Sequence, residues 1–116
     1  MADARRHLAE IVRRVFPPHA DVHEIPSGDI RIRADWNLGD DPERPNKRSR
    51  PIEVVISEEA VEDYTSGSVE GRRQADERLR LYLSTCLKSF RAEHDVARHI
   101  PIPAEEWVVN TRRLNG

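Results

Sequence analysis

Three residues near the start of the chain have the types and spacing of metal ligands. His19, Asp21 and His23 alternate along HADVHEI, so a strand there would place all three on one face. Residues two apart on a strand are separated by about 6.7 Å, so an adjacent pair could share a metal ion. His19 and His23 would be about 13 Å apart and could not. A further ligand would have to come from elsewhere, such as His94 or His99. Because no Cys or HExxH pattern supports such a set, we expect no metal site.

Two other groups could do covalent or acid–base chemistry. Cys86 is the only cysteine, but it lies between Leu83 and Phe90 on the apolar stripe of a predicted helix, which indicates a buried structural thiol. Four acids could supply paired carboxylates for acid–base catalysis: Glu58, Glu59, Glu62 and Asp63. The first two of these acids begin a predicted helix, where the helix dipole already favours them. No phosphate-binding or nucleophile-elbow motif is present. We therefore expect a protein that is not an enzyme and uses no cofactor.

Residues 41–51, DPERPNKRSRP, could bind a polyanion. The cations that could contact phosphate are Arg44, Lys47, Arg48 and Arg50 in this stretch, with Arg31 and Arg33 on the preceding strand. Nearby acids at 40, 41 and 43 cancel most of this charge. The aromatic residues that could stack on bases occupy predicted core positions. We interpret the stretch as a solvated hairpin tip whose prolines and charges discourage edge-to-edge pairing. A nucleic-acid contact and a protein-docking loop are the alternatives.

The composition is that of one small polar domain. The chain has 116 residues, of which 37% are hydrophobic and 34% charged, and its net charge is −2. The net charge does not attract a polyanion, so any basic site must be local.

A single cysteine excludes an internal disulfide and fits a reducing compartment. The first 16 residues carry acids and no long apolar run, unlike a signal peptide. No segment reaches the roughly 18 apolar residues of a membrane span. We expect a cytoplasmic protein without a membrane partner.

Apolar periodicity predicts seven elements in the order α-β-β-β-α-α-β. Helices are expected at about 3–16, 58–65 and 69–91, and strands at about 19–25, 30–38, 51–57 and 105–111. The strict alternation of IRIRADWNL is typical of an antiparallel sheet with one buried and one wet face. We therefore predict a single α+β domain over residues 1–110, with a curled antiparallel sheet of about four strands and helices packed on one face. Residues 111–116 are predicted to be a flexible tail.

Three apolar residues are predicted to lie outside the core. Leu81 lies opposite the apolar stripe of the long helix, Val55 points to the wet face of its strand, and Val108, or else Trp107, faces outward from the last strand. Single exposed apolar residues are ordinary, but several on a small polar protein suggest an interface. A two-fold homodimer is the commonest arrangement.

The run from DIRIRADWNL through DDPERPNKRSRPIEVVISEEAVEDY to EEWVV resembles a family of short bacterial proteins of unknown function, over about residues 29–110. That resemblance implies no activity, ligand or site. The αβββα order is also similar to a double-stranded-RNA-binding domain, but that family has a lysine cluster where this chain has VEGRR. Secretion chaperones that combine a helix with a curled sheet are similar in size, dimeric and non-enzymatic, and usually carry more strands after the last long helix.

Together these observations predict a non-catalytic protein-interaction, adaptor or chaperone-like module that acts as a homodimer, with a protein partner that the sequence does not identify. The alternative is a nucleic-acid-binding module that uses the basic loop 44–50.

Overall fold

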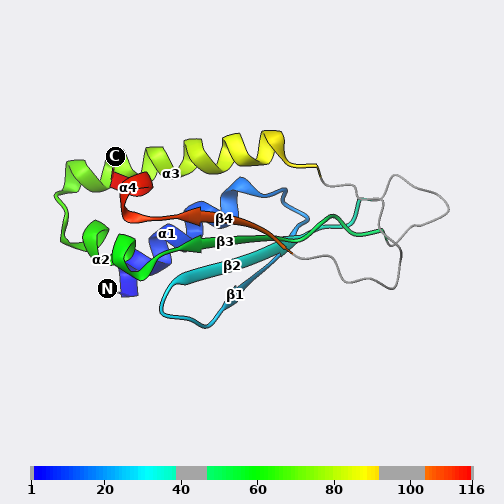
Figure 1. The fold of residues 1–116 in the computed structure, drawn as a ribbon, viewed down its shortest axis with the longest axis horizontal. Coiled ribbons are helices and arrows are strands. Elements are labelled where there is room, and N and C mark those ends of the chain that lie inside the picture. Colours follow the sequence, from blue (N-terminus) through cyan, green and yellow to red (C-terminus); the bar gives the residue numbers. More distant parts are fainter. Residues whose placement is uncertain (1, 39–46, 92–103, 116) are drawn as a thin grey trace.

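A computed structural model describes residues 2–38, 47–91 and 104–115. The predicted element order is confirmed, and one short helix follows the last strand. Figure 1 shows the long helix α3 running along the sheet. The elements are α1 (Ala2–Val15), β1 (Asp21–Ile25), β2 (Ile30–Asp35), β3 (Ile52–Ile56), α2 (Glu58–Ser66), α3 (Val69–Ser89), β4 (Glu105–Val109) and α4 (Thr111–Asn115).

The four strands form one open, mixed sheet in the order β1-β2-β3-β4. The first two pairings are antiparallel, as predicted, but β4 runs parallel to β3, with Ile52 opposite Glu105 and Ile56 opposite Val109. The prediction of a wholly antiparallel sheet is therefore wrong for the last strand. The reason lies in the connection. Helix α3 carries the chain back along the sheet, so β4 starts at the same end as β3, as parallel neighbours require.

The hairpin between β2 and β3 extends beyond both strands. The backbone N–H of Ser49 donates to the carbonyl of Trp36 (2.7 Å), and that of Leu38 donates to Lys47 (2.9 Å). The buried Ser49 hydroxyl also accepts a hydrogen bond from the Trp36 N–H at 3.0 Å. Residues 47–50 therefore belong to a paired arm of the hairpin and not to its tip. Residues 39–46, which include most of the predicted tip, lie outside the described part of the chain.

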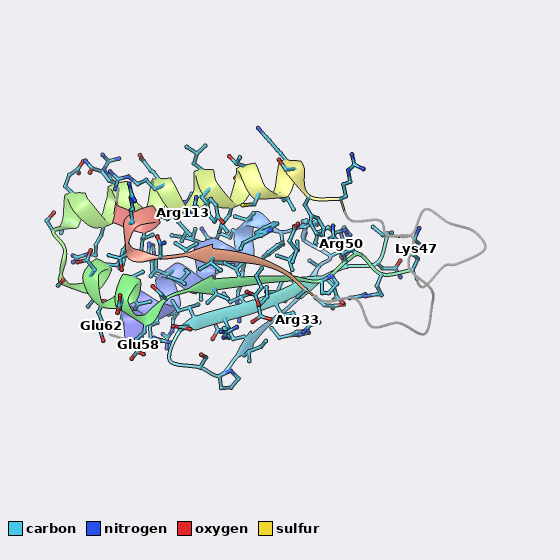
Figure 2. The ribbon with its side chains drawn as sticks, viewed as in Figure 1. Arg33, Lys47, Arg50, Glu58, Glu62 and Arg113 are labelled. Atoms are coloured by element: carbon cyan, nitrogen blue, oxygen red, sulfur yellow. The ribbon has the colours of Figure 1, made fainter. Side chains whose placement is uncertain are left out.

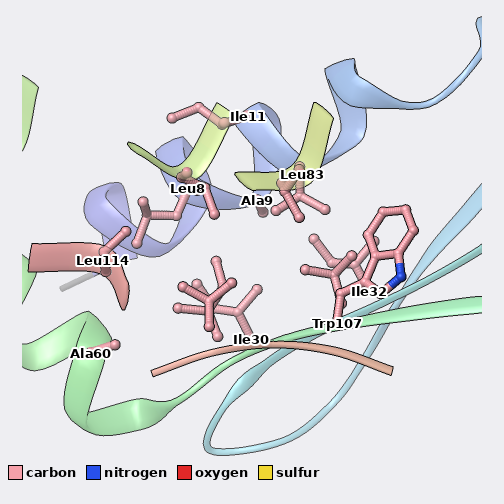
Figure 3. Packing of buried hydrophobic residues seen from close by; sticks show 14 of the residues in the cluster. Leu8, Ala9, Ile11, Ile30, Ile32, Ala60, Leu83, Trp107 and Leu114 are labelled. Carbon is pink, nitrogen blue, oxygen red and sulfur yellow. The ribbon is translucent and has the colours of Figure 1, made fainter. Parts of the chain in front are cut away.

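The core fills the space between the sheet and the helices, as Figure 3 shows. The predicted alternation of β2 is confirmed, because Ile30, Ile32, Ala34 and Trp36 are all buried. Helix α1 contributes Leu8 and Val12, and α3 contributes Ala75, Leu79 and Leu83. Aromatic rings extend the core towards the hairpin end: Phe16, Trp36, Phe90 and Trp107, with neighbouring ring centroids 5.8–6.5 Å apart. One apolar layer thus holds the helices against a single face of the sheet.

Two serines cap the N-termini of helices α2 and α3. The Ser57 hydroxyl accepts a hydrogen bond from the Ala60 N–H at 3.2 Å, and the Ser68 hydroxyl accepts one from the Gly71 N–H at 3.0 Å. Each bond satisfies a donor that the helix itself cannot pair. None of the helices in the described residues is long and apolar enough to cross a membrane.

Residues 111–115, predicted to be a flexible tail, form helix α4. Leu114 is completely buried, and the Asn110 side chain accepts a hydrogen bond from the Arg113 N–H at 2.8 Å, in the manner of an N-cap. The Arg113 guanidinium lies over the Tyr82 ring, 4.2 Å from its centroid. The prediction overlooked Leu114 because a single apolar residue in a short charged segment has no periodicity. Helix α4 is therefore a docked part of the domain.

Candidate interaction surface on the open sheet face

One face of the sheet carries no helix of the described chain. The core takes only every second residue of each strand, and the residues between them point the other way. We call this second side the open face. Figure 2 shows Arg33 at the side of the sheet opposite α3. The open face is formed by Asp21, His23, Ile25, Arg31, Arg33, Asp35, Glu53, Val55, Glu106 and Val108.

A mainly apolar row, interrupted by Arg31, crosses the open face from one edge strand to the other; we call it the apolar row. The strand register places Ile25, Arg31, Val55 and Val108 side by side. The edge residues are exposed, Ile25 at 36% and Val108 at 47%, whereas Val55 is only 7% exposed. The predicted exposure of Val55 is therefore wrong. Val55 does point away from the core, but it lies on a central strand, between Arg31 and Val108 in the strand register. On β4, Val108 faces outward and Trp107 is buried.

A charged row lies beside the apolar row and is divided by sign. It runs from His23 and Arg33 on the first two strands to Glu53 and Glu106 on the last two. Glu53 accepts a hydrogen bond from Arg31, and this bond raises the pKa of the Arg31 guanidinium. Arg33 and Glu106 are exposed and form no ion pair with any other described residue. In this row the first two strands therefore carry the imidazole and guanidinium groups, and the last two strands carry the carboxylates. Beyond the row, Asp21 and Asp35 on the first two strands both contact Arg48.

The other cations of the predicted polyanion site are mostly held by partners within the protein. Arg48 donates to Asp35 at 2.6 Å and also to Asp21, and these hydrogen bonds raise its pKa. The Arg50 guanidinium lies 3.9 Å from Glu105 and 5.5 Å from the centroid of the Phe90 ring. Figure 2 shows Lys47 beyond Arg50 along the hairpin.

The five predicted cations that the structure describes are not brought together as one free basic patch. Arg44 lies outside the described residues. Arg31, Arg48 and Arg50 already have carboxylate partners. Only Lys47 and Arg33 have no ion pair within the part of the chain that the structure describes.

Leu81 belongs to a different surface from Val55 and Val108. It is 70% exposed on the outer side of α3, while the buried stripe of that helix faces the sheet. The whole helix layer and the sheet therefore separate Leu81 from the open face. The three predicted interface residues cannot act in one flat contact.

The candidates for chemistry do not form a site in the described structure. His19 and His23 are exposed, and His94 and His99 lie outside the described residues. No group of three or more metal-ligating side chains is found among the residues that are described. Glu58 and Glu62 lie at the surface of α2, as Figure 2 shows, and Glu59 and Asp63 are exposed on the same helix. Cys86 is only half-buried, less than predicted, and packs beside the core.

Sequence reasoning missed a carboxylate that joins three helices. Asp76 on α3 accepts a hydrogen bond from the Tyr64 hydroxyl of α2 at 2.9 Å, and its other oxygen lies 2.8 Å from Nε2 of His7 on α1. The four-residue spacing along α3 would instead favour ion pairs from Asp76 to Arg72 and Arg80. The signal that could have revealed the contact is a tyrosine on the apolar face of α2, since a buried hydroxyl requires a polar partner.

Comparison with known proteins does not assign the chain to a family. No family model matches the chain, and neither a curated protein nor a solved structure is a match. The resemblance to short bacterial proteins of unknown function therefore stays a prediction.

Proposed function

We propose that this protein is a non-catalytic interaction module that acts as a homodimer in the bacterial cytoplasm, and that the open face is its contact surface. The observation that carries the proposal is the apolar row on a sheet face that no described helix covers. A two-layer domain normally buries one face of its sheet and keeps the other polar. Here the other face presents Ile25 and Val108 at its edges and Val55 between them.

The cytoplasmic location is supported by the sequence argument from a single unpaired cysteine. The adaptor or chaperone-like role is supported by the absence of a catalytic constellation among the described residues. The partner that such a module would serve, beyond its own second copy, is to be found by affinity capture from the native cell.

The homodimer is tested by light scattering coupled to size exclusion at micromolar concentration. We expect about twice the chain mass of 13.4 kDa for the wild type. Val108→Arg places a charge at an exposed position of the open face, so it should yield a monomer with an unchanged helix signal. Leu81→Arg is the matched control, because it places the same charge on the outer side of α3 and should leave the dimer intact. A wild-type mass near 13.4 kDa at all accessible concentrations would overturn the proposal.

A further inference from the structure

We infer that the two copies pack with their open faces against each other, about a two-fold axis that runs parallel to the strands. The axis lies midway between the two stacked sheets, at the position between β2 and β3. The inference rests on the proposed homodimer and specifies its geometry, which that proposal leaves open. The occupant of the open face is thus a second copy of this chain, and each residue of the face has a defined opposite residue.

The position of the axis follows from the strand order. A two-fold axis parallel to the strands turns one sheet over onto the other and keeps every residue at its level along the strands. With the axis between the two central strands, β2 lies over β3 of the second copy and β1 lies over β4 of the second copy. All four strands are then covered in both copies. Sheets stacked in this way lie about 10 Å apart, with strand directions within about 30° of each other.

The apolar rows of the two copies then meet. Ile25 lies opposite Val108 of the second copy, and Arg31 lies over Val55 of the second copy, because each pair occupies the same level of the strand register. The exposed edge residues therefore gain apolar neighbours from the second copy. The stem of Arg31 covers apolar surface while its guanidinium keeps the hydrogen bond to Glu53 of its own chain.

The charged rows meet in complementary pairs. His23 lies opposite Glu106 of the second copy, so its ring N–H faces a carboxylate, and Arg33 lies opposite Glu53 of the second copy. The His23 and Arg33 end of one row thus covers the glutamate end of the other, and the two-fold axis repeats this match. Such self-complementarity is what an isologous interface requires. It gives partners to the exposed Arg33 and Glu106, which have no ion pair with other described residues.

A different axis, directly over β3, makes a different prediction. It would place Arg33 opposite Glu106 of the second copy and leave β1 outside the contact. His23 is therefore the residue that distinguishes the two positions of the axis, since it takes part in the first arrangement only.

The test uses two charge changes that are favourable inside one copy and unfavourable between copies. His23 pairs across the strands with Arg33, so His23→Glu adds a carboxylate beside a cation of its own chain. Glu106 pairs with Glu53, so Glu106→Lys removes a like-charge neighbour. Between copies, the first change places carboxylates opposite each other, and the second removes the carboxylate that faces the imidazole. We therefore expect both variants to remain as stable as the wild type, and urea unfolding of each variant measures this. A loss of dimer at unchanged stability cannot come from a damaged fold.

We expect His23→Glu to weaken the dimer at least about tenfold and Glu106→Lys to weaken it by less, as measured by sedimentation velocity. An equimolar mixture of His23→Glu and Glu106→Lys should recover association as a heterodimer, because each contact then joins opposite charges or the original pair. Native mass spectrometry identifies that heterodimer by its mass. A wild-type dimer that His23→Glu does not weaken, or two weakened variants that do not associate when mixed, would overturn this geometry while leaving the homodimer in place. A monomeric wild type would overturn both proposals.

Discussion

Asp76 shows how one side chain can hold three helices. Only 14% of its side chain is exposed, and its two oxygens contact Tyr64 on α2 and His7 on α1. A carboxylate with so little access to water needs such partners, because leaving a buried charge unpaired is costly. Burial and the hydrogen bond to Asp76 both raise the pKa of the Tyr64 hydroxyl. The neutral phenol is therefore part of the folded state.

At this residue scale we predict that Tyr64→Phe lowers the free energy of unfolding by about 1–2 kcal/mol at pH 7, because the carboxylate loses a donor. The raised pKa means that the contribution of Tyr64 is complete below the ordinary value of 10.0 and is lost as the pH rises above it. The wild type should therefore lose stability above pH 10 more steeply than the variant. Urea unfolding from pH 7 upward measures both effects. Tyr82 is present in both proteins and cancels in the comparison. Parallel stability curves would contradict the role given to Tyr64.

At the scale of elements, α4 was the part of the fold that was hardest to predict from the sequence. Strands and long helices are recognised by repeated apolar positions. The alternation of β2 predicted its buried residues correctly, and the stripe of α3 did so for Ala75, Leu79 and Leu83 but not for Cys86. Helix α4 has a single apolar residue, Leu114, and its burial depends on the packing of α4 against α2 and α3. The direction of β4 relative to β3 could not be predicted from the sequence either. The apolar residues of β4 alternate in the same way whether the strand runs parallel or antiparallel to β3, and only the path of α3 decides between these directions.

We predict that Leu114→Ala lowers the free energy of unfolding by about 2–4 kcal/mol, because it removes most of a fully buried side chain and leaves a cavity. Leu81→Ala is the control, because the same substitution at a 70% exposed position should change stability by less than about 0.5 kcal/mol. Urea denaturation of both variants, monitored by the helix signal, makes the comparison. Equal effects of the two changes would show that α4 is not docked in solution.

At the scale of the whole molecule, the candidate surface was only partly foreseeable. The alternation of β2 and β3 predicted that Arg31, Arg33 and Val55 face away from the core. The sequence could not show that Glu53 would form an ion pair with Arg31, or that Val108 would lie beside Val55. Both facts depend on strand register. It also grouped Leu81 with the other two apolar residues, although the helix layer separates them.

The ion pairs of Arg31, Arg48 and Arg50 lead us to expect no submicromolar binding of RNA or DNA. Titrations of labelled duplex and single strands at two salt concentrations test this. The reference variant replaces Arg44, Lys47, Arg48 and Arg50 together by Ser. If any of these cations binds phosphate, its removal should flatten the log–log salt dependence of binding by about one unit. Tight, salt-sensitive binding that this variant loses would favour the nucleic-acid alternative.

The parallel pairing of β3 with β4 also has a consequence for how the chain folds. Of the four strands, β4 is synthesised last, and it must pair with a strand from the middle of the chain. Such distant pairings form slowly, because the loss of chain entropy precedes the contacts that offset it. Until β4 arrives, β3 is itself an edge, and its sequence IEVVI is rich in the β-branched residues that favour pairing between molecules. A chain that stops before Glu105 should therefore accumulate as aggregate during synthesis, even though three of its four strands are complete.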